Sequence, residues 1–208
     1  MKKIAYLVVA VGFISSAVAG SYDDFFSALR NDNASALQSL LQRGFDPNTR
    51  DPQGQPGLTF ALREQSLKTA KVLIALPNLE VDAANQANET ALMIAALKGD
   101  LDDAKALLDR GAQVNRTGWT PLHYAASGPD VRLVALMLDR GADIDAPSPN
   151  GTTPLMMAAQ YGSEDSVKLL LARGADPKRR NQRELGAADF AKLGGRQGLA
   201  TQLEALQR

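Results

Sequence analysis

Short runs of apolar residues at helical spacing, each followed by a glycine, recur along most of the chain. In one of them, Val131, Val134, Met137 and Leu138 lie one to three positions apart, and Gly141 follows. This spacing predicts a helix with one apolar face, and glycine suits a helix end because it adopts the left-handed conformation freely. The pattern therefore predicts a series of short amphipathic helices.

The helical pattern repeats with a period near 33 residues. Thr90, Thr120 and Thr153 each open a helical run that contains two adjacent alanines, at 95/96, 125/126 and 158/159. The end of the following run is also in phase, with successive separations of 34, 33, 30 and 33 residues between Gly44, Asn78, Gly111, Gly141 and Gly174. Several signals in register at one period indicate a repeat protein.

Each unit is predicted to hold two short antiparallel helices and an extended loop. Threonine is favoured as an N-cap because its oxygen accepts a backbone N–H, and Pro121 or Pro154 fits the first helical position, where no donor is needed. The paired alanines let a second helix approach closely. Neither helix can bury its apolar face alone, so neighbouring units must stack into a solenoid.

These strings resemble the ankyrin repeat, whose pattern of a glycine-containing finger, Thr-Pro-Leu-His, paired alanines and a closing Gly-Ala-Asp is matched best at 118–146. The resemblance covers about 22–208. It implies an all-α ankyrin-repeat solenoid of about six helix-turn-helix units with extended finger loops. We place the units at approximately 22–50, 51–84, 85–114, 115–147, 148–180 and 181–208.

Two internal units depart from the repeat pattern. In the second, Pro56, Gly57 and Thr59 replace the usual helix opening, and one extra residue precedes Asn78. The finger "NRTGWT" between the third and fourth units is three residues shorter than its counterparts. This shorter finger predicts a notch in the row of loops.

The terminal units have the character of caps. Ser21 stands three residues before Asp24, which predicts the start of the first helix by a variant of the capping box. The last unit carries Lys192, Arg196 and Gln202 where an internal unit needs apolar or small residues. Polar outer faces on end units keep a solenoid soluble and stop its extension.

The first nineteen residues have the pattern of a secretory signal peptide. Lys2 and Lys3 precede an apolar run over 4–18, and small residues stand at Ala17 and Ala19. The run is shorter than the ~20 residues that span a bilayer. We therefore expect a signal peptide at 1–19 with cleavage after Ala19, and a periplasmic domain at 20–208 that is not inserted in the membrane.

Composition narrows the possible functions. The 208 residues carry 23 basic and 23 acidic side chains, and removing Lys2 and Lys3 leaves a net charge of −2. Nucleic acid is not expected as a partner, because phosphate binding needs a surplus of cations. The absence of cysteine excludes thiolate chemistry and cysteine metal sites, and a single histidine excludes a paired-histidine site. We expect no catalytic residue, no cofactor and no metal.

The single tryptophan and the single histidine lie in the string "GWTPLHYAA". The family resemblance implies that His123 bonds the threonine hydroxyl and the backbone of the adjoining loop, a structural role. It also implies that Trp119 projects to the concave surface, although an indole in that place can instead cover core. Tyr124 and Phe190 are assigned to the core. The predicted contact surface consists of Trp119, Tyr161, Gln160, Arg116, Thr117, Leu97, Lys98, Glu89, Gln86 and Thr152.

The favoured hypothesis is a non-enzymatic module, monomeric on its own, that binds a protein partner through its fingers and concave first-helix face. The partner would be an exported enzyme or a secreted toxin, with this chain as accessory or immunity factor. One alternative is a cell-wall or glycan hydrolase, since paired carboxylates can cleave glycosides. Its candidate pairs are Asp102/Asp103, Asp143/Asp145 and Glu164/Asp165. A second alternative is a structural spacer.

Overall fold

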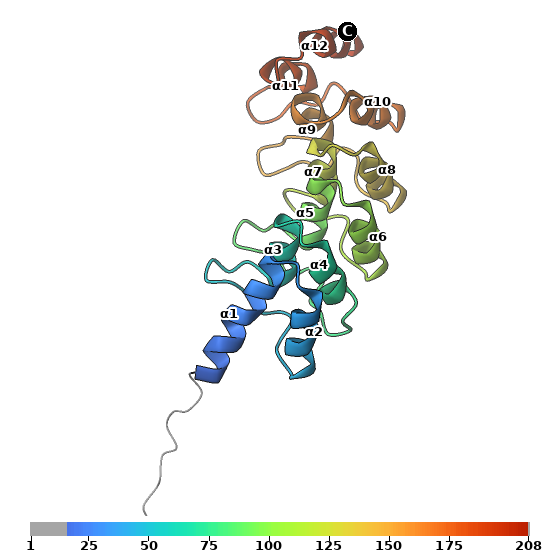
Figure 1. The fold of residues 1–208 in the computed structure, drawn as a ribbon. Helices are drawn as coiled ribbons and strands as arrows, with labels where there is room; N and C mark the ends of the chain where they lie inside the picture. The colour runs from blue at the N-terminus through green and yellow to red at the C-terminus, as the bar shows by residue number, and fades with distance from the viewer. Residues whose placement is uncertain (1–15, 208) are drawn as a thin grey trace, which may run out of the picture.

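The computed structural model describes residues 16–207, which form helices, one isolated bridge between Arg50 and Pro56, and no strand. Twelve helices follow one another as six helical hairpins, as the repeat pattern predicted (Figure 1). They are α1 (Ser16–Arg30), α2 (Ala34–Gln42), α3 (Gly57–Arg63), α4 (Leu67–Ile74), α5 (Ala91–Lys98), α6 (Leu101–Asp109), α7 (Pro121–Ser127), α8 (Val131–Asp139), α9 (Pro154–Tyr161), α10 (Glu164–Ala172), α11 (Ala187–Leu193) and α12 (Gln197–Leu206).

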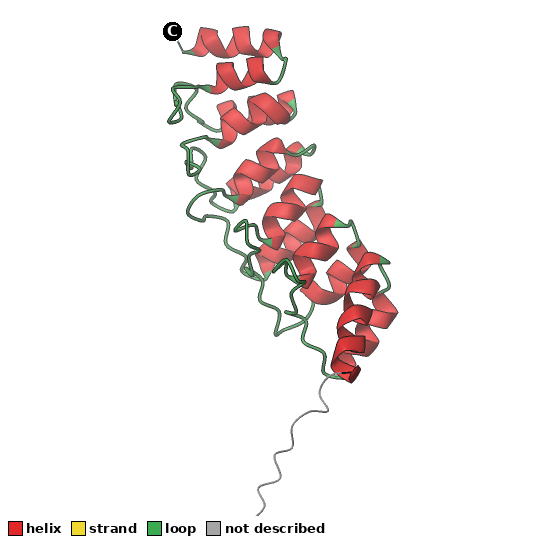
Figure 2. Cartoon of the chain, turned by 90° about the vertical axis from the view of Figure 1, so that its left-hand side faces the viewer, coloured by secondary structure: helices red, strands yellow, loops and turns green. Residues whose placement is uncertain are grey.

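The hairpins stack into two rows of helices. In the odd-numbered row, each helix from α1 to α11 contacts the next member of the row, and α2, α4, α6, α8 and α10 form the second row in the same way. Finger loops join each hairpin to the next and project along one side of the stack (Figure 2). The core is therefore continuous along the molecule rather than gathered at one centre.

Small residues allow the odd-numbered helices to pack closely. The alanines at 95/96, 125/126 and 158/159 are fully buried. A Cβ built on Gly162, just after α9, would lie 2.0 Å from the Ala126 carbonyl oxygen of α7. In the second unit, a Cβ on Gly57 would lie 2.7 Å from the Phe25 ring. The unusual opening of that unit therefore makes room for the aromatic core of the first.

The helix ends largely follow the sequence prediction. Pro121 and Pro154 open α7 and α9, and the repeat glycines Gly44, Gly111, Gly141 and Gly174 have φ between 83° and 95°. The aligned residue Asn78 does not adopt a positive φ. The end of α4 is instead closed by Arg110, whose guanidinium donates to the backbone carbonyls of Ile74 and Leu76.

The threonine caps are more varied than the sequence predicted. The Thr153 hydroxyl accepts the Met156 N–H at 3.4 Å, whereas the Thr90 hydroxyl has no hydrogen-bond partner. The reciprocal bond is more regular, because in α5, α7, α9 and α11 the third residue of the helix accepts the N–H of the capping residue. The acceptors are the sulfurs of Met93 and Met156, Nδ1 of His123 and the carboxylate of Asp189.

Four fingers share one turn geometry and the short finger lacks it. Each of the four is closed by two backbone hydrogen bonds, as between Ser148 and Thr152 and between Gly151 and Ser148, at 2.9 and 2.8 Å. Neither bond is formed in the short finger at 115–119, although Gly118 keeps the left-handed conformation at the equivalent place. The finger that carries Trp119 is therefore a simpler bend.

Two expectations for the chain ends are corrected. Helix α1 begins at Ser16, so Ser21 lies within the helix and does not open it. Arg196 is not part of a polar outer face, since its guanidinium donates to three carbonyls at the end of α9. Most of the predicted signal peptide lies outside the described residues. None of the helices in 16–207 combines the length and apolar character needed to cross a bilayer.

Candidate functional site

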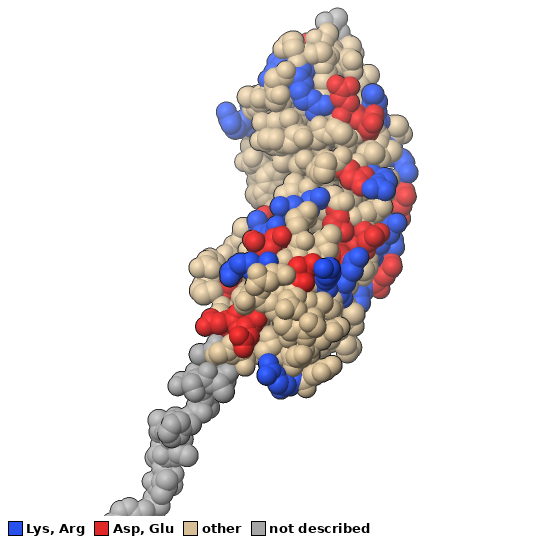
Figure 3. Space-filling view, in the orientation of Figure 1, with Lys and Arg blue, Asp and Glu red and all other residues tan. Residues whose placement is uncertain are grey.

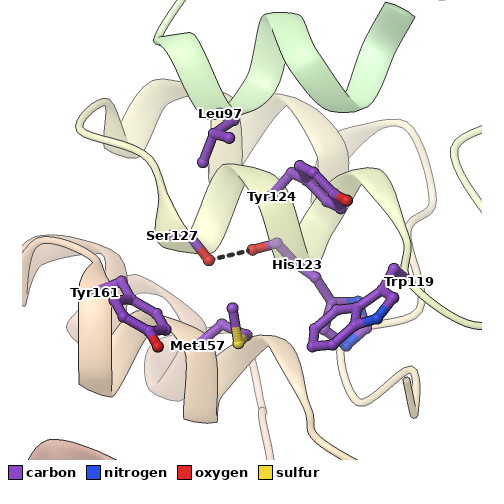
Figure 4. Close-up of a pocket in the computed structure, with 7 residues that line it drawn as sticks. All are labelled: Leu97, Trp119, His123, Tyr124, Ser127, Met157 and Tyr161. Atoms are coloured by element: carbon purple, nitrogen blue, oxygen red, sulfur yellow. Dashed lines mark hydrogen bonds between the residues drawn. The ribbon is translucent and has the colours of Figure 1, made fainter. Parts of the chain in front are cut away.

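An apolar concavity lies where α5, α7 and α9 meet the short finger (Figure 4). Its volume is about 410 Å³ and it is open to solvent. We call it the aromatic hollow; its lining residues are Leu97, Trp119, His123, Tyr124, Ser127, Met157 and Tyr161. Figure 3 shows that the surface over α7 and α9 is uncharged, whereas charged side chains gather over the even-numbered helices. An apolar concavity between repeats is suited to receive a ligand or a partner side chain.

Trp119 forms one wall of the hollow and is half-buried. It stands between Gly118, with φ at 87°, and the capping Thr120. Its ring meets the His123 ring edge to face, with centroids 5.2 Å apart and planes at 78°. The indole is thus held by packing on its neighbour while part of its surface stays open. Its role in binding stays a prediction.

His123 lies beneath the hollow and is fully buried. Its Nδ1 accepts the Thr120 N–H at 3.2 Å and lies 2.9 Å from the Thr120 hydroxyl, while Nε2 lies 2.9 Å from the Thr152 carbonyl oxygen. The Thr120 amide can only donate, so Nδ1 carries no proton, and the Thr152 carbonyl can only accept, so Nε2 carries one. The imidazole is therefore neutral and donates from Nε2. Burial lowers the pKa of His123 to about 4. The predicted structural role of the imidazole is confirmed.

The assignment of Tyr124 to the core holds only in part, because the side chain packs against the core without being fully buried. The side chain is half-buried and lines the hollow. Its hydroxyl donates to the Glu89 carboxylate at 3.0 Å. Burial and the nearby Glu89 charge raise the pKa of Tyr124. Met157 occupies the same position in the next repeat and also lines the hollow. Their shared position in the repeat is the sequence signal by which both lining residues could have been predicted.

Glu89 was predicted as an exposed contact residue, but its side chain is only 16% exposed and its carboxylate is already engaged. It pairs with Arg63 and accepts from Asn85 at 2.7 Å as well as from Tyr124. Burial alone would raise the pKa of Glu89, but the hydrogen bonds from Asn85 and Tyr124 and the Arg63 charge outweigh burial and lower it. The carboxylate therefore braces α3, the finger and α7 together.

The other predicted contact residues divide by exposure. Thr152 is buried, at 1% exposure, because its carbonyl accepts from His123 and its N–H donates to Ser148 Oγ; its assignment to the surface was wrong. Gln160 and Arg116 are half-buried, and Arg116 donates to Asn88 in the neighbouring finger at 3.1 Å. The remaining five are exposed: Gln86, Leu97, Lys98, Thr117 and Tyr161.

Only part of the predicted surface meets in one place. Leu97, Trp119 and Tyr161 line the hollow, and Tyr161 is 61% exposed. The exposed polar members stand on fingers or at helix ends outside its lining. Ser127, Tyr124 and Met157 complete the hollow without having been predicted. The binding role of the whole set stays a prediction.

The carboxylate pairs considered for hydrolysis lie away from the hollow. Asp102 and Asp103 stand in the first turn of α6, and Glu164 and Asp165 in the first turn of α10. Asp143 and Asp145 lie in the turn after α8, where their oxygens accept the backbone N–H groups of Asp145 and Asp176. Acidic side chains in the first turn of a helix are stabilised by the helix dipole. No carboxylate lines the hollow, and no cluster of three or more metal-ligating side chains occurs among residues 16–207.

Comparison with known proteins gives a family and several relatives. A family model described as ankyrin repeats in three copies matches residues 25–118 and 114–181. The chain is 31% identical over 179 residues to the tyrosine-protein kinase Shark of Drosophila melanogaster, an alignment that covers 83% of this chain and 19% of the kinase. It is 44% identical over 86 residues to ankyrin repeat, SAM and basic leucine zipper domain-containing protein 1 of Oryctolagus cuniculus, covering 38% of this chain and 18% of that protein. The chain spans less than a fifth of the length of these two relatives.

Among solved structures, the chain is similar to an immunity protein from Bdellovibrio bacteriovorus, seen in complex with a predatory endopeptidase. The TM-score is 0.74 and the sequence identity is 25%. The match covers 88% of this chain and 97% of the other. The likeness thus extends over nearly the whole of that protein, unlike the partial matches above.

Proposed function

The chain belongs to the ankyrin-repeat family, and on that premise we propose that it is an exported, non-enzymatic module that binds a bacterial protein in the periplasm. Proteins of this family are interaction modules. The partner we propose is an exported enzyme, which the chain restrains as an immunity factor or supports as an accessory factor. The docking surface is the aromatic hollow with the fingers around it.

One observation carries this proposal: the likeness along 97% of an immunity protein that was solved on its endopeptidase. The side chains of the aromatic hollow also support this proposal. Exposed aromatic side chains flanked by polar groups are enriched among the residues that dominate binding energy at interfaces. Trp119 is already fixed by its packing on His123, so little conformational freedom would be lost on binding.

The proposal is tested by capture of partners from a periplasmic extract of the source bacterium. The wild-type chain is compared with Trp119→Ala plus Tyr161→Ala, which removes both aromatic side chains from the rim. A control variant, Leu193→Ala plus Leu206→Ala, removes two exposed apolar side chains from the last unit. We expect a protein retained by the wild type and the control to be lost from the rim variant. Equal capture by all three chains would remove the hollow from consideration.

The role and the location are tested on the captured protein. If that protein is an enzyme, its activity is measured with and without the purified chain: inhibition supports an immunity role, and preserved or increased activity supports an accessory role. For location, the chain is expressed with its own N-terminus and recovered from osmotic-shock fluid, and its mass is measured. A mass that matches a chain starting at Gly20 supports export, whereas retention of the full-length chain in the cytoplasm contradicts export.

A further inference from the structure

Few charged side chains belong to the segments that form the aromatic hollow. The three central fingers and odd-numbered helices, at 85–98, 115–127 and 148–161, contain only Glu89, Lys98 and Arg116 as charged residues. Glu89 is paired with Arg63. Neither Lys98 nor Arg116 is in a salt bridge within residues 16–207. Lys98 follows the lining residue Leu97, and Arg116 stands three residues before Trp119, so two cations outside these salt bridges adjoin lining residues of the hollow in the sequence.

The opposite row of helices carries charges of both signs. Helices α6, α8 and α10 and their C-caps contain six acidic residues and six basic residues. Four of these cations, Arg132, Arg140, Lys168 and Arg173, are in salt bridges. Lys98 and Arg116 differ from them in having no such partner.

Arg116 is pre-positioned for a carboxylate. Its Nη2 donates to Asn88 in the neighbouring finger at 3.1 Å, while its buried Nε has no partner in the described structure. A guanidinium presents a rigid fork of donors that matches a carboxylate. It stands three residues before Trp119 in the same finger. The chemistry at this edge of the hollow thus calls for an anion beside an apolar group.

The hollow itself selects an aromatic group. Trp119, Tyr124 and Tyr161 surround it, and the thioether of Met157 lies on its floor (Figure 4). Aromatic rings pair favourably edge to face with other rings, and methionine sulfur makes favourable contacts with ring edges. A charged or small polar side chain would lose its hydration there without a partner.

We propose that the aromatic hollow receives an aromatic side chain carried on an acidic loop of the partner protein, with Arg116 and Lys98 binding the carboxylates beside it. This deepens the proposed function and rests on it. A second copy of this chain is a less suitable occupant, because two like-charged rims would face each other in a symmetric dimer. The acidic aromatic loop satisfies the hollow and both cations at once.

The test uses the chain's only tryptophan as a reporter. Trp119 lies in the wall of the hollow, and its fluorescence is followed while peptides without tryptophan are added to the full chain. The probe is Asp-Asp-Phe-Glu-Asp; its controls are Asp-Asp-Ala-Glu-Asp and Lys-Lys-Phe-Lys-Lys. We expect a saturable change with the probe alone, weakened by added salt because the flanking contacts are ionic. The absence of a saturable change up to about 1 mM, the weakest range of specific binding, or equal responses to all three peptides, would overturn the proposal.

Matched variants locate the contacts. Met157→Glu, which places a carboxylate on the floor of the hollow, should abolish the response, whereas Leu193→Glu on the last unit should not. Arg116→Gln and Lys98→Gln should each weaken binding roughly two- to fivefold, the worth of an exposed ion pair. Lys105→Gln removes an exposed cation from α6, in the even-numbered row, and should leave binding unchanged. Equal effects of Lys98→Gln and Lys105→Gln would contradict the assigned charge contacts.

A final arm separates this inference from the proposed function. The acidic phenylalanine peptide is added to the complex with the captured periplasmic protein, and displacement is expected. If the rim variant loses that protein but neither the peptide nor Met157→Glu affects capture, the partner contacts the rim without filling the hollow, and only the inference fails. If no protein depends on the rim at all, the proposed function fails as well. If sedimentation of the chain alone depends on its concentration, the chain self-associates, and a second copy of it is the competing occupant of the hollow.

Discussion

His123 joins two repeats, since its Nε2 donates to the Thr152 carbonyl of the next finger at 2.9 Å while its Nδ1 accepts the Thr120 N–H of its own helix. We predict that His123→Ala lowers the free energy of unfolding by about 2–4 kcal/mol, because it leaves a cavity and two buried groups unpaired. His123→Met, which copies Met93 and Met156 of neighbouring units, should cost less. Urea unfolding at pH 7.5 measures both. Both variants lack the bond to Thr152, so a His123→Met chain as stable as the wild type would show that the cross-repeat bond adds nothing.

The same residue predicts a pH dependence. Burial lowers the pKa of His123 from its ordinary value of 6.5 to about 4, so the unfolded chain binds this proton more readily than the folded one. Its stabilising contribution is therefore complete above about pH 6.5 and is lost as the pH falls through about 4. The stability deficit of His123→Met should be largest at pH 7.5 and should shrink toward pH 4. A deficit that is constant over this range would contradict the buried neutral imidazole.

Asp103 should show the opposite dependence. Its side chain is buried at the start of α6, and burial, followed by the Asp100 charge, raises the pKa of Asp103 to about 6 although Lys71 opposes the shift. The folded state is then most favoured when this carboxyl is protonated, and stability is lost as the pH rises from about 4 through about 6. We predict that Asp103→Asn raises the free energy of unfolding by roughly 1–2 kcal/mol at pH 7.5.

The gain from Asp103→Asn should disappear near pH 4, where the wild-type carboxyl is itself neutral in the folded chain. Thermal unfolding at pH 4 and 7.5 gives the comparison. Asp102→Asn is the matched control, because Asp102 is exposed in the same helical turn; it should change stability by no more than about 0.5 kcal/mol. A destabilised Asp103→Asn chain at neutral pH would mean that the ionised carboxylate caps α6 more strongly than burial disfavours it.

Gly162 is required by packing rather than by its backbone conformation. Its φ and ψ are −82° and −179°, which any residue adopts, but an added Cβ would lie 2.0 Å from the Ala126 carbonyl oxygen. Because α7 and α9 would have to separate, Gly162→Ala is expected to cost about 2 kcal/mol or more. Gly198→Ala, within α12 and with open space around it, should stabilise by about 0.5–1 kcal/mol. Chemical unfolding of both variants checks the contrast, and a neutral Gly162→Ala would contradict this packing.

Much of the fold could be predicted from the sequence because the same physical requirements recur in each repeat. Periodic threonines, alanines and glycines locate the helix ends, and the structure has the expected six hairpins. The repeat pattern predicts a helix end least well where a side chain from one unit satisfies the backbone groups of another unit. Asn78 occupies the phase of a helix-ending glycine, but Arg110 from the next hairpin satisfies the carbonyls there. Such a contact has no signal within the unit itself.

The candidate site was harder to predict for a related reason. Repeat phase gives the position of a residue in its unit, whereas burial depends on the rotamers of the neighbouring unit. Thr152 appeared to be a surface residue, yet Ser148 and His123 enclose its backbone groups. Tyr124 and Met157 share one phase of the repeat, and both side chains line the hollow. A concavity lined by three helices and a finger can be located only once these elements are seen together.

The last unit is held to the stack by Arg196, and this gives a further prediction. Its guanidinium donates to the carbonyls of Ala158, Ala159 and Gly162 at 2.9–3.0 Å, where a positive charge is favoured at a helix C-terminus. Arg196→Ala should lower the free energy of unfolding by about 1.5–3 kcal/mol, since charged hydrogen bonds to carbonyls that have left water are lost. Hydrogen exchange should quicken first in α11 and α12. The control is Lys192→Ala, which breaks the exposed ion pair with Glu204 in the same unit and should alter exchange little. If both variants exchange alike, water replaces the guanidinium at the end of α9, and the last unit is held by its apolar contacts alone.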